Sequence, residues 1–565
     1  MLYREFFYKY YGRFQLPSLK ITKFGGIAPR IQSQNLNESM AQVALDVDLS
    51  RTTLRPWRTD NKVSDKTGLS FYADNCCYLT ADNCRASFAK IEGDCDFIVA
   101  TDVLEYPVIR KKDQLCNGEW RRLGFPVDIP ALTAQSLGTL DNTFNNETRH
   151  YFYTLLSDFD GLGWQESMPS PVSEAVYCNN DFDVVLSGIP TSLPTYMISA
   201  VRIYCNVTQL DYGTDKTEAE SEFLLVEEIP FGTSVYTHEA HVDYGEACIT
   251  EEYAPPSDKM HDITYCGNGQ LGGLVDCELW LSEPRKPHAW NEAFRYSRFN
   301  GKPKRFLCGE KIGYILTDEY PSVISMESPC TSAGCRSIVS LEEPHPIVSL
   351  NSACLYNGSC LYATKDGLVM LSGTQSKVIT ADFYTYDQWQ AIKPWTMRGV
   401  VHDGYYFGTT EDRTIRFKIP DQIHENATIE ALTELSIKPL AWYRSDQDRL
   451  FYALNDGIYE WNVGMDWKTF KWQGRLSVLS GYTAMTAYKL VHDYEPTRVV
   501  HTGYKRHRSE MVQEPVILGD KIAIDSRPCR LKAGYSTIDF DVMITGKGEV
   551  REYHVATSVS ELGEK

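Results

Sequence analysis

Residues 361–372 read LYATKDGLVMLS, and residues 450–461 read LFYALNDGIYEW. Each stretch alternates apolar and aromatic side chains around a central Asp-Gly pair, the pattern of two short strands joined by a tight hairpin turn. In the second stretch, the predicted strand 450–454 is apolar on both faces. A strand of this kind needs cover on both sides, so we expect its sheet to lie between two others.

The same hairpin recurs along the chain. Its turns fall at Asp318, Asp366, Asp412 and Asp456, so the intervals are 48, 46 and 44 residues. Short strands that repeat about every 45 residues are typical of β-propeller blades, in which neighbouring four-stranded sheets cover each other. Two earlier stretches have the same strand–turn–strand pattern: residues 94–110 and 272–284.

The remaining stretches divide the chain into four parts. After residue 149, short strands with Pro- and Gly-rich turns lack the blade period, which favours an inserted sandwich of the fibronectin or immunoglobulin type. We therefore predict an all-β fold, with a propeller-like body, an inserted sandwich and a small C-terminal β region. The predicted parts are residues 1–140 (N-terminal segment and first blades), 141–256 (sandwich), 257–480 (remaining blades) and 481–565 (C-terminal region). The best candidate for a helix is short, at residues 424–436.

The composition limits the possible functions. Of the 565 residues, 43% are hydrophobic and 23% are charged, which is ordinary for a folded soluble chain. The formal charge of −19 argues against a nucleic-acid-binding surface over most of the chain. It still permits a passage through which DNA slides without adhering. No run approaches the ~20 apolar residues that cross a bilayer, so we expect no membrane span.

The 16 cysteines raise the question of disulfides. Several lie in or beside apolar, strand-like runs, where a free thiol behaves as a small hydrophobic side chain. These are Cys95, Cys178, Cys205, Cys308, Cys354 and Cys360. The first 20 residues are aromatic and basic, without the apolar core of a secretory signal. We therefore expect free thiols in a protein made in a cytosol, the alternative being a secreted, disulfide-rich adhesin.

Four stretches, taken in order, resemble one family of proteins. They are residues 24–58 (FGGIAPR to LRPWR), 151–176 with the later RIYCN and FLLVEEIP, 279–291 with 313–325, and 528–562. Together they resemble the tail nozzle or tail-tube proteins of short-tailed bacteriophages, also called tail tubular protein B. The chain departs from the family pattern where cysteine replaces usual strand residues. It also lacks a signature that separates the nozzle from other tail-hub components.

The resemblance implies a structural virion protein without enzymatic activity or cofactor, located in the tail and made in the host cytoplasm. It implies a ring of six copies whose channel conducts DNA and ejected proteins without specific DNA binding. The implied partners are other copies, an adjoining adaptor or portal-proximal ring, and tail fibres. We expect acidic residues to line the channel, because they would repel DNA from its wall. The aromatic residues 1–12 are expected to dock on a neighbour or on the chain itself.

The stretch SEPRKPHAWN contains Glu283, Arg285, His288 and Trp290. A catalytic interpretation makes His288 a general base beside Glu283. The two prolines around a basic pair favour a turn between sheets instead, with Trp290 packed inside. We therefore predict no catalytic residue here.

Three further patterns are candidates for metal or modification sites. Cys330 and Cys335 could be half of a zinc site with Cys308, Cys354 or Cys360, and Cys76 is adjacent to Cys77. No second close cysteine pair completes four ligands, so we predict no metal site. The sequence SDFDG (157–161) lacks the full calcium loop and favours a tight turn. Five Asn-x-Ser/Thr sequences are ascribed to chance: Asn37, Asn146, Asn206, Asn357 and Asn426.

The most basic short run is YKRHRS (504–509), with Lys489 and Arg498 nearby. It could contact phosphate or an acidic partner, but a solvated loop is the simpler interpretation. Phosphate-loop, dinucleotide and nucleophile-elbow motifs do not occur. A receptor-binding or glycan-degrading propeller remains the alternative function, although the repeated Asp box of sialidase propellers is missing from the sequence.

Overall fold

The computed structural model describes residues 18–74, 77–91, 97–116, 118–138, 146–159, 163–209, 222–267, 269–327, 336–506, 513–532 and 536–562. Within these residues the chain is almost entirely β, with one α-helix, α2 (Tyr386–Ala391). This confirms the predicted all-β class. The chain forms two compact units, one made of Met1–Gly68 and Ile347–Lys565 and the other of Leu69–Pro346.

The unit formed by Leu69–Pro346 contains three antiparallel four-stranded sheets in which each strand pairs with the next along the chain. The first has β8 (Ser87–Ile91), β9 (Phe97–Thr101), β10 (Val108–Lys111) and β11 (Arg121–Arg122). The second has β20 (His261–Cys266), β21 (Gln270–Val275), β22 (Glu278–Leu281) and β23 (Arg295–Tyr296). The third has β24 (Pro303–Cys308), β25 (Ile312–Thr317), β26 (Ser322–Ser325) and β27 (Ile338–Ser340). A hairpin precedes them, β6 (Ser70–Asp74) and β7 (Cys77–Ala81).

Hydrophobic cores join these sheets in order. Phe97 and Val99 of the first sheet pack with Leu271 of the second. Leu279 of the second packs in another core with Phe306 of the third. The middle sheet is therefore buried on both faces, as its apolar pattern requires.

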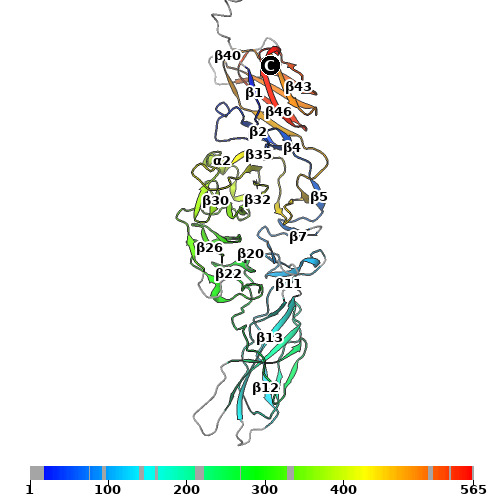
Figure 1. The fold of residues 1–565 in the computed structure, drawn as a ribbon, viewed down its shortest axis with the longest axis vertical. Helices are drawn as coiled ribbons and strands as arrows, with labels where there is room; N and C mark the ends of the chain where they lie inside the picture. The colour runs from blue at the N-terminus through cyan, green and yellow to red at the C-terminus, as the bar shows by residue number, and fades with distance from the viewer. Residues whose placement is uncertain are drawn as a thin grey trace, which may run out of the picture. The chain divides into compact units, whose positions relative to one another are not determined.

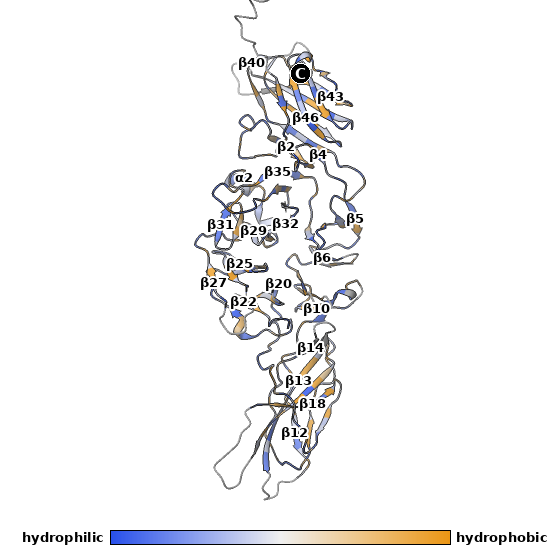
Figure 2. Ribbon diagram, in the orientation of Figure 1, coloured by the Kyte–Doolittle hydropathy of each residue, from blue (hydrophilic) through white to orange (hydrophobic). Residues whose placement is uncertain are grey.

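Between the first and second sheets the chain forms a two-layered insertion. One layer has β12 (Thr133–Ser136), β16 (Val184–Ser187) and β19 (Val235–His238). The other has β13 (Asn146–Phe159), β14 (Gly163–Glu166), β15 (Val176–Asn179), β17 (Ala200–Gln209) and β18 (Leu224–Pro230). The layers share one core, to which β13 contributes Tyr151, Tyr153 and Leu155 and β16 contributes Leu186. Figure 2 shows hydrophobic stretches along β13 and β18.

The unit that holds both ends of the chain contains three further four-stranded sheets. The first has β28 (Cys354–Tyr356), β29 (Ser359–Ala363), β30 (Leu368–Ser372) and β31 (Gln375–Val378). The second has β32 (Arg398–His402), β33 (Tyr405–Thr409), β34 (Thr414–Lys418) and β35 (Glu430–Leu435). The third has β36 (Ala441–Arg444), β37 (Leu450–Leu454) and β38 (Gly457–Glu460), and it is completed by β5 (Asn61–Ser64). The four predicted hairpins at Asp318, Asp366, Asp412 and Asp456 are confirmed.

The helix predicted at residues 424–436 is wrong. Residues 430–435 form strand β35, which pairs with β34 and, through Leu45, with the N-terminal strand β2 (Ala41–Leu45). Leu432, Thr433 and Leu435 are buried against these neighbours, so tertiary packing overrides a helical preference that is locally weak. The short helix α2 begins instead at a capping box in which Thr385 and Gln388 satisfy each other's backbone N–H groups.

The strands after residue 469 combine with N-terminal strands. They are β39 (Phe470–Gly474), β40 (Ser477–Thr483), β41 (Ala487–His492), β42 (Thr497–Arg506), β43 (Gln513–Ala523), β44 (Cys529–Arg530), β45 (Thr537–Gly546) and β46 (Val550–Ala556). β2 pairs with β39, and β1 (Leu19–Ile21) pairs with β46, which lies beside it in Figure 1. A small ladder joins β3 (Val47–Asp48) and β4 (Arg55–Pro56). Residues 481–565 therefore share sheets with strands from the start of the chain, whereas the sequence predicted a separate region.

Candidate functional surface on the inserted sandwich

The chain enters and leaves the insertion at one place. Gly124 has a φ of +83°, and a Cβ atom at this position would lie 2.7 Å from Cδ of Pro256. Only glycine combines this backbone conformation with so close an approach. The two connecting segments therefore touch at Gly124 and Pro256, and we call residues 124–256 the insertion.

Aromatic and cationic side chains join the insertion to the segments that flank it. The guanidinium of Arg122 stacks on Tyr106 and on Tyr196 of the insertion, at 4.7 and 5.4 Å from the ring centroids. It also pairs with Asp258. Lys286 lies 4.2 Å from the ring centroid of Tyr253. These contacts make the joint a packed interface rather than a bare linker.

His288 lies at the centre of this joint. Its side chain is buried, and Nε2 donates a hydrogen bond of 3.1 Å to the carbonyl of Glu166 in β14. The ring packs edge-on against Phe125 and Tyr253. Burial lowers the pKa of His288 to about 3, so the imidazole is neutral at physiological pH. His288 acts in packing.

Glu283 has other partners than His288. Its carboxylate accepts a hydrogen bond from Asn291 at 3.3 Å, and burial raises the pKa of Glu283. Arg285 takes a left-handed turn conformation, with a φ of +59°. Trp290 is fully buried and donates to the carbonyl of Pro287 at 2.9 Å. As predicted, this stretch forms a turn, and its residues stabilise the joint.

The insertion carries nearly all of the net charge. Residues 124–256 contain 21 Asp and Glu residues but only three Lys and Arg residues, a formal charge of −18. The rest of the chain contains 54 acidic and 53 basic residues, a formal charge of −1. Acidic and basic residues therefore nearly balance outside the insertion, and the expected acidic lining of a channel stays a prediction.

Many of these carboxylates lie along one border of the sandwich. Residues 245–248 run beside β18, with backbone hydrogen bonds between Leu225 and both Glu246 and Gly245. The exposed acidic residues of this border and of the turns next to it, which we call the acidic edge, are Glu222, Glu227, Glu228, Glu239, Asp243, Glu246, Glu251 and Glu252. No Lys or Arg occurs between Lys216 and Lys259. This stretch without basic residues is a sequence signal from which the acidic edge could have been predicted.

A buried polar cluster lies inside the sandwich. Arg149 and Glu147 form an ion pair with side chains only 3% and 7% exposed. The hydroxyl of Tyr151 hydrogen-bonds Nδ1 of His238 at 2.9 Å. Burial, and then the charge of Arg149, lower the pKa of His238 to about 4. Since each group has a partner, the cluster specifies the packing of the two layers.

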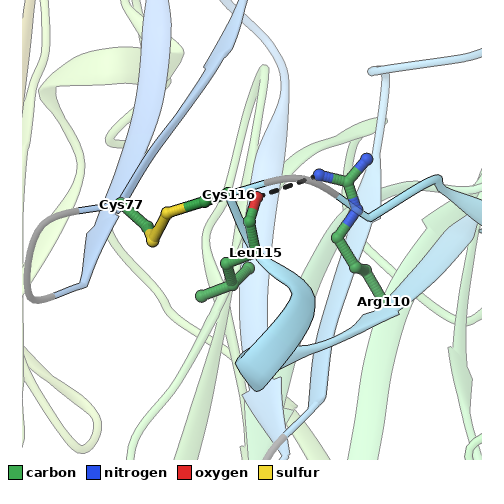
Figure 3. The surroundings of a disulfide bond; sticks show 4 residues. All are labelled: Cys77, Arg110, Leu115 and Cys116. Atoms are coloured by element: carbon green, nitrogen blue, oxygen red, sulfur yellow. Dashed lines mark hydrogen bonds between the residues drawn. A yellow bond between two sulfur atoms is a disulfide. The ribbon is translucent and has the colours of Figure 1, made fainter.

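A disulfide joins Cys77 at the start of β7 to Cys116. Figure 3 shows it beside Arg110, whose guanidinium donates to the carbonyl of Leu115 at 3.2 Å. The expectation of free thiols is therefore wrong for this pair. It agrees with Cys178, Cys205, Cys308 and Cys354, which are free. Cys77 and Cys116 are 39 residues apart and share no sequence motif, so the sequence alone did not predict that they pair.

The described residues include no group of three or more side chains suited to a metal ion. Cys354 and Cys360 stand at non-opposed positions of β28 and β29, and Cys308 belongs to the other unit. Cys76, Cys330 and Cys335 lie outside the described residues. Of SDFDG, Ser157, Asp158 and Phe159 belong to β13, which pairs with β14 up to Phe159 and Gly163. Asp160 and Gly161, where the sequence favours a turn, lie outside the described residues.

The basic run 504–509 lies only partly within the described residues, because residues 507–512 fall outside them. Residues 1–12 fall outside them as well. Arg498 forms a two-pronged ion pair with Asp520 at 2.8 and 2.6 Å, and Lys489 lies on β41. Of the five glycosylation-like asparagines, Asn146 is buried. In the part of the chain that the structure describes, no helix has the length and apolar character needed to cross a bilayer.

No protein-family model and no curated protein matches the chain. Solved structures give weak likenesses. Human WBSCR16 is 8% identical with a TM-score of 0.21, over 56% of this chain and 99% of that one. PorZ, a surface component of the type-IX secretion system of Porphyromonas gingivalis, is 11% identical with a TM-score of 0.26, over 93% and 83%. A Bacillus subtilis glycoside hydrolase of family 43 is 7% identical with a TM-score of 0.14, over 67% and 94%. Such scores identify neither fold nor function.

Proposed function

We propose that this chain is a structural virion protein of a short-tailed bacteriophage, forming a ring-shaped tail tube or nozzle that conducts DNA and ejected proteins. The observation that carries the proposal is the ordered set of four stretches that resemble the tail nozzle family. The stretch 151–176 contains most of strand β13 and all of β14, and 279–291 contributes Trp290 to the joint with the insertion. The stretches that resemble the family therefore also contain strands and buried residues of the insertion and its joint.

In this proposal the repeated four-stranded sheets are blades of a propeller-like body. Two features support it: strands that pair in sequence order, and hydrophobic cores between successive sheets. Such sheets cover one another and leave few exposed edges, which suits a rigid wall. Copies then associate head to tail, and a head-to-tail interface whose rotation closes makes a ring. The resemblance implies six copies.

The insertion serves as the contact module of the ring. Its acidic edge presents eight exposed carboxylates, so the partner that it fits has a basic surface, on an adjoining ring or a tail fibre. Acidic residues that line the passage would repel DNA from its wall, and this expectation stays a prediction.

The decisive experiment labels intact phage particles with a gold-conjugated antibody against this chain and locates the label by electron microscopy. Label at the distal tip of the tail supports a nozzle, and rings of the purified chain in the same microscope support the assembly. Label on lateral fibres, or none on particles, would instead favour a receptor-binding or glycan-degrading propeller, and glycan assays would then follow.

A further inference from the structure

Two neighbouring sheets bring a pair of buried thiols together. Cys266 is the last residue of β20, and Cys308 is the last residue of β24. Both thiols are free and buried in the core that the two sheets share. Cys308 is the neighbour that most affects the Cys266 thiol, and each sulfur lies near a backbone carbonyl, that of Thr264 at 4.0 Å and that of Gly309 at 3.4 Å.

The backbones next to the two cysteines also approach each other. A Cβ atom at Gly267, which follows Cys266, would lie 3.0 Å from the carbonyl oxygen of Glu310. Gly272, on the adjacent strand, leaves space that Phe306 and the sulfur of Cys266 occupy. A disulfide requires Cα atoms about 4.4–6.8 Å apart, and the close approach of Gly267 to Glu310 brings the two strand ends toward such a distance.

We propose that Cys266 and Cys308 form an oxidisable dithiol whose disulfide joins sheet β20–β23 covalently to sheet β24–β27. Two thiols lose two protons and two electrons, and one S–S bond forms. The oxidant is a small disulfide such as oxidised glutathione, which is reduced to two thiols, or an azo compound such as diamide, which is reduced to its hydrazine. The site is independent of the proposed virion role, since it needs only these two sheets.

The surroundings determine when the bond forms. Burial raises the pKa of Cys266 well above its ordinary value, which disfavours the reactive thiolate. The positive charge of Arg336 near the thiol acts in the opposite direction and lowers the pKa of Cys266. Arg336 is fixed in place, because it donates to Gln270 at 2.6 Å and to the carbonyl of Ser325 at 2.9 Å. The pair therefore stays reduced in a cytosol and closes slowly in an oxidising medium.

Peptide mapping of the full chain tests this site. The reduced protein is unfolded in urea, refolded with a glutathione redox couple, blocked with N-ethylmaleimide and digested with trypsin without reduction. We expect peptide 260–285 to be joined to peptide 306–311, which contains Cys308. Peptide 260–285 also contains Cys277, so Cys277→Ser must keep the linked product and Cys308→Ser must lose it.

A second measurement uses the folded protein. Diamide should raise the midpoint of thermal unfolding of the native chain by several degrees, but not that of Cys308→Ser. Cys178→Ser, which removes another buried free thiol, should respond like the native chain. The proposal is overturned if Cys266 and Cys308 both carry N-ethylmaleimide after refolding and after diamide. It is equally overturned if Cys308 is joined to Cys277.

Discussion

Tyr452 donates a hydrogen bond of 2.6 Å to Asp60, although 392 residues separate them. The same carboxylate accepts from Nζ of Lys468 at 2.7 Å and from the backbone N–H of Asn462 at 2.8 Å. Burial, and then the charge of Asp60, raise the pKa of Tyr452, so its hydroxyl remains a donor. Asp60 therefore secures the N-terminal segment where β5 completes the sheet of β36–β38.

Replacing this carboxylate should loosen that sheet. We expect Asp60→Asn to lower stability by about 3 kcal/mol, because it leaves the ammonium of Lys468, 14% exposed, without its ion-pair partner. The measurement is the midpoint of thermal unfolding by calorimetry. Asp65→Asn is the matched control, since Asp65 pairs with Lys62 while 94% exposed, and it should leave the midpoint unchanged. Equal midpoints for both variants would contradict this role of Asp60.

The disulfide between Cys77 and Cys116 should stabilise the unit to which it belongs. It closes a segment of 39 residues, for which loop entropy in the unfolded chain gives about 2–4 kcal/mol. We expect Cys77→Ser to lower the unfolding midpoint in the absence of reductant. With reductant present, the variant and the native chain should have the same unfolding midpoint. Cys84→Ser, which removes an exposed free thiol, should have no effect under either condition.

The buried imidazole of His238 should make the insertion sensitive to acid. Its pKa is about 4 in the folded chain and ~6.5 when unfolded, so between these values the unfolded chain binds more protons. The contribution of neutral His238 to the free energy of unfolding is complete above pH 6.5. It is lost as the pH falls toward 4, and the loss is on the order of 3 kcal/mol. Unfolding should be followed from pH 7.5 to 4 for His238→Gln and the native chain.

The native midpoint should fall more steeply with acid than that of the variant. His288 and His501, whose pKa values burial lowers to about 3, contribute equally to both profiles and cancel in the comparison. Parallel profiles would mean that His238 does not titrate on unfolding.

Neutralising the acidic edge should weaken assembly. The triple variant Glu227→Gln, Glu239→Gln and Glu246→Gln removes three exposed charges, and we expect several-fold lower incorporation into particles. The control variant Glu327→Gln, Glu342→Gln and Asp382→Asn removes three exposed charges elsewhere. Because exposed charges are screened by salt, added salt should weaken partner binding by the native chain more than by the triple variant. Equal incorporation of both variants would exclude the acidic edge as a docking surface.

The sequence alone determined the local units. Alternating apolar residues around turns at Asp366 and Asp456 specify hairpins, because neighbouring residues form both the strand pair and its turn. The same reasoning identified the turn around Trp290. The acidity of residues 217–258 could also have been found this way, since charge is a property of composition.

Only the tertiary structure decided which distant segments complete the sheets. β5 pairs with β38, and β2 lies between β35 and β39, although nothing in their own residues specifies these partners. Residues 430–435 form a strand for the same reason, because burial between β34 and β2 outweighs a weak local preference. The pairings Cys77–Cys116 and Cys266 with Cys308 also depend on how sheets pack. Contacts between residues far apart in the chain depend on all the elements that bring them together, so no short pattern predicts them.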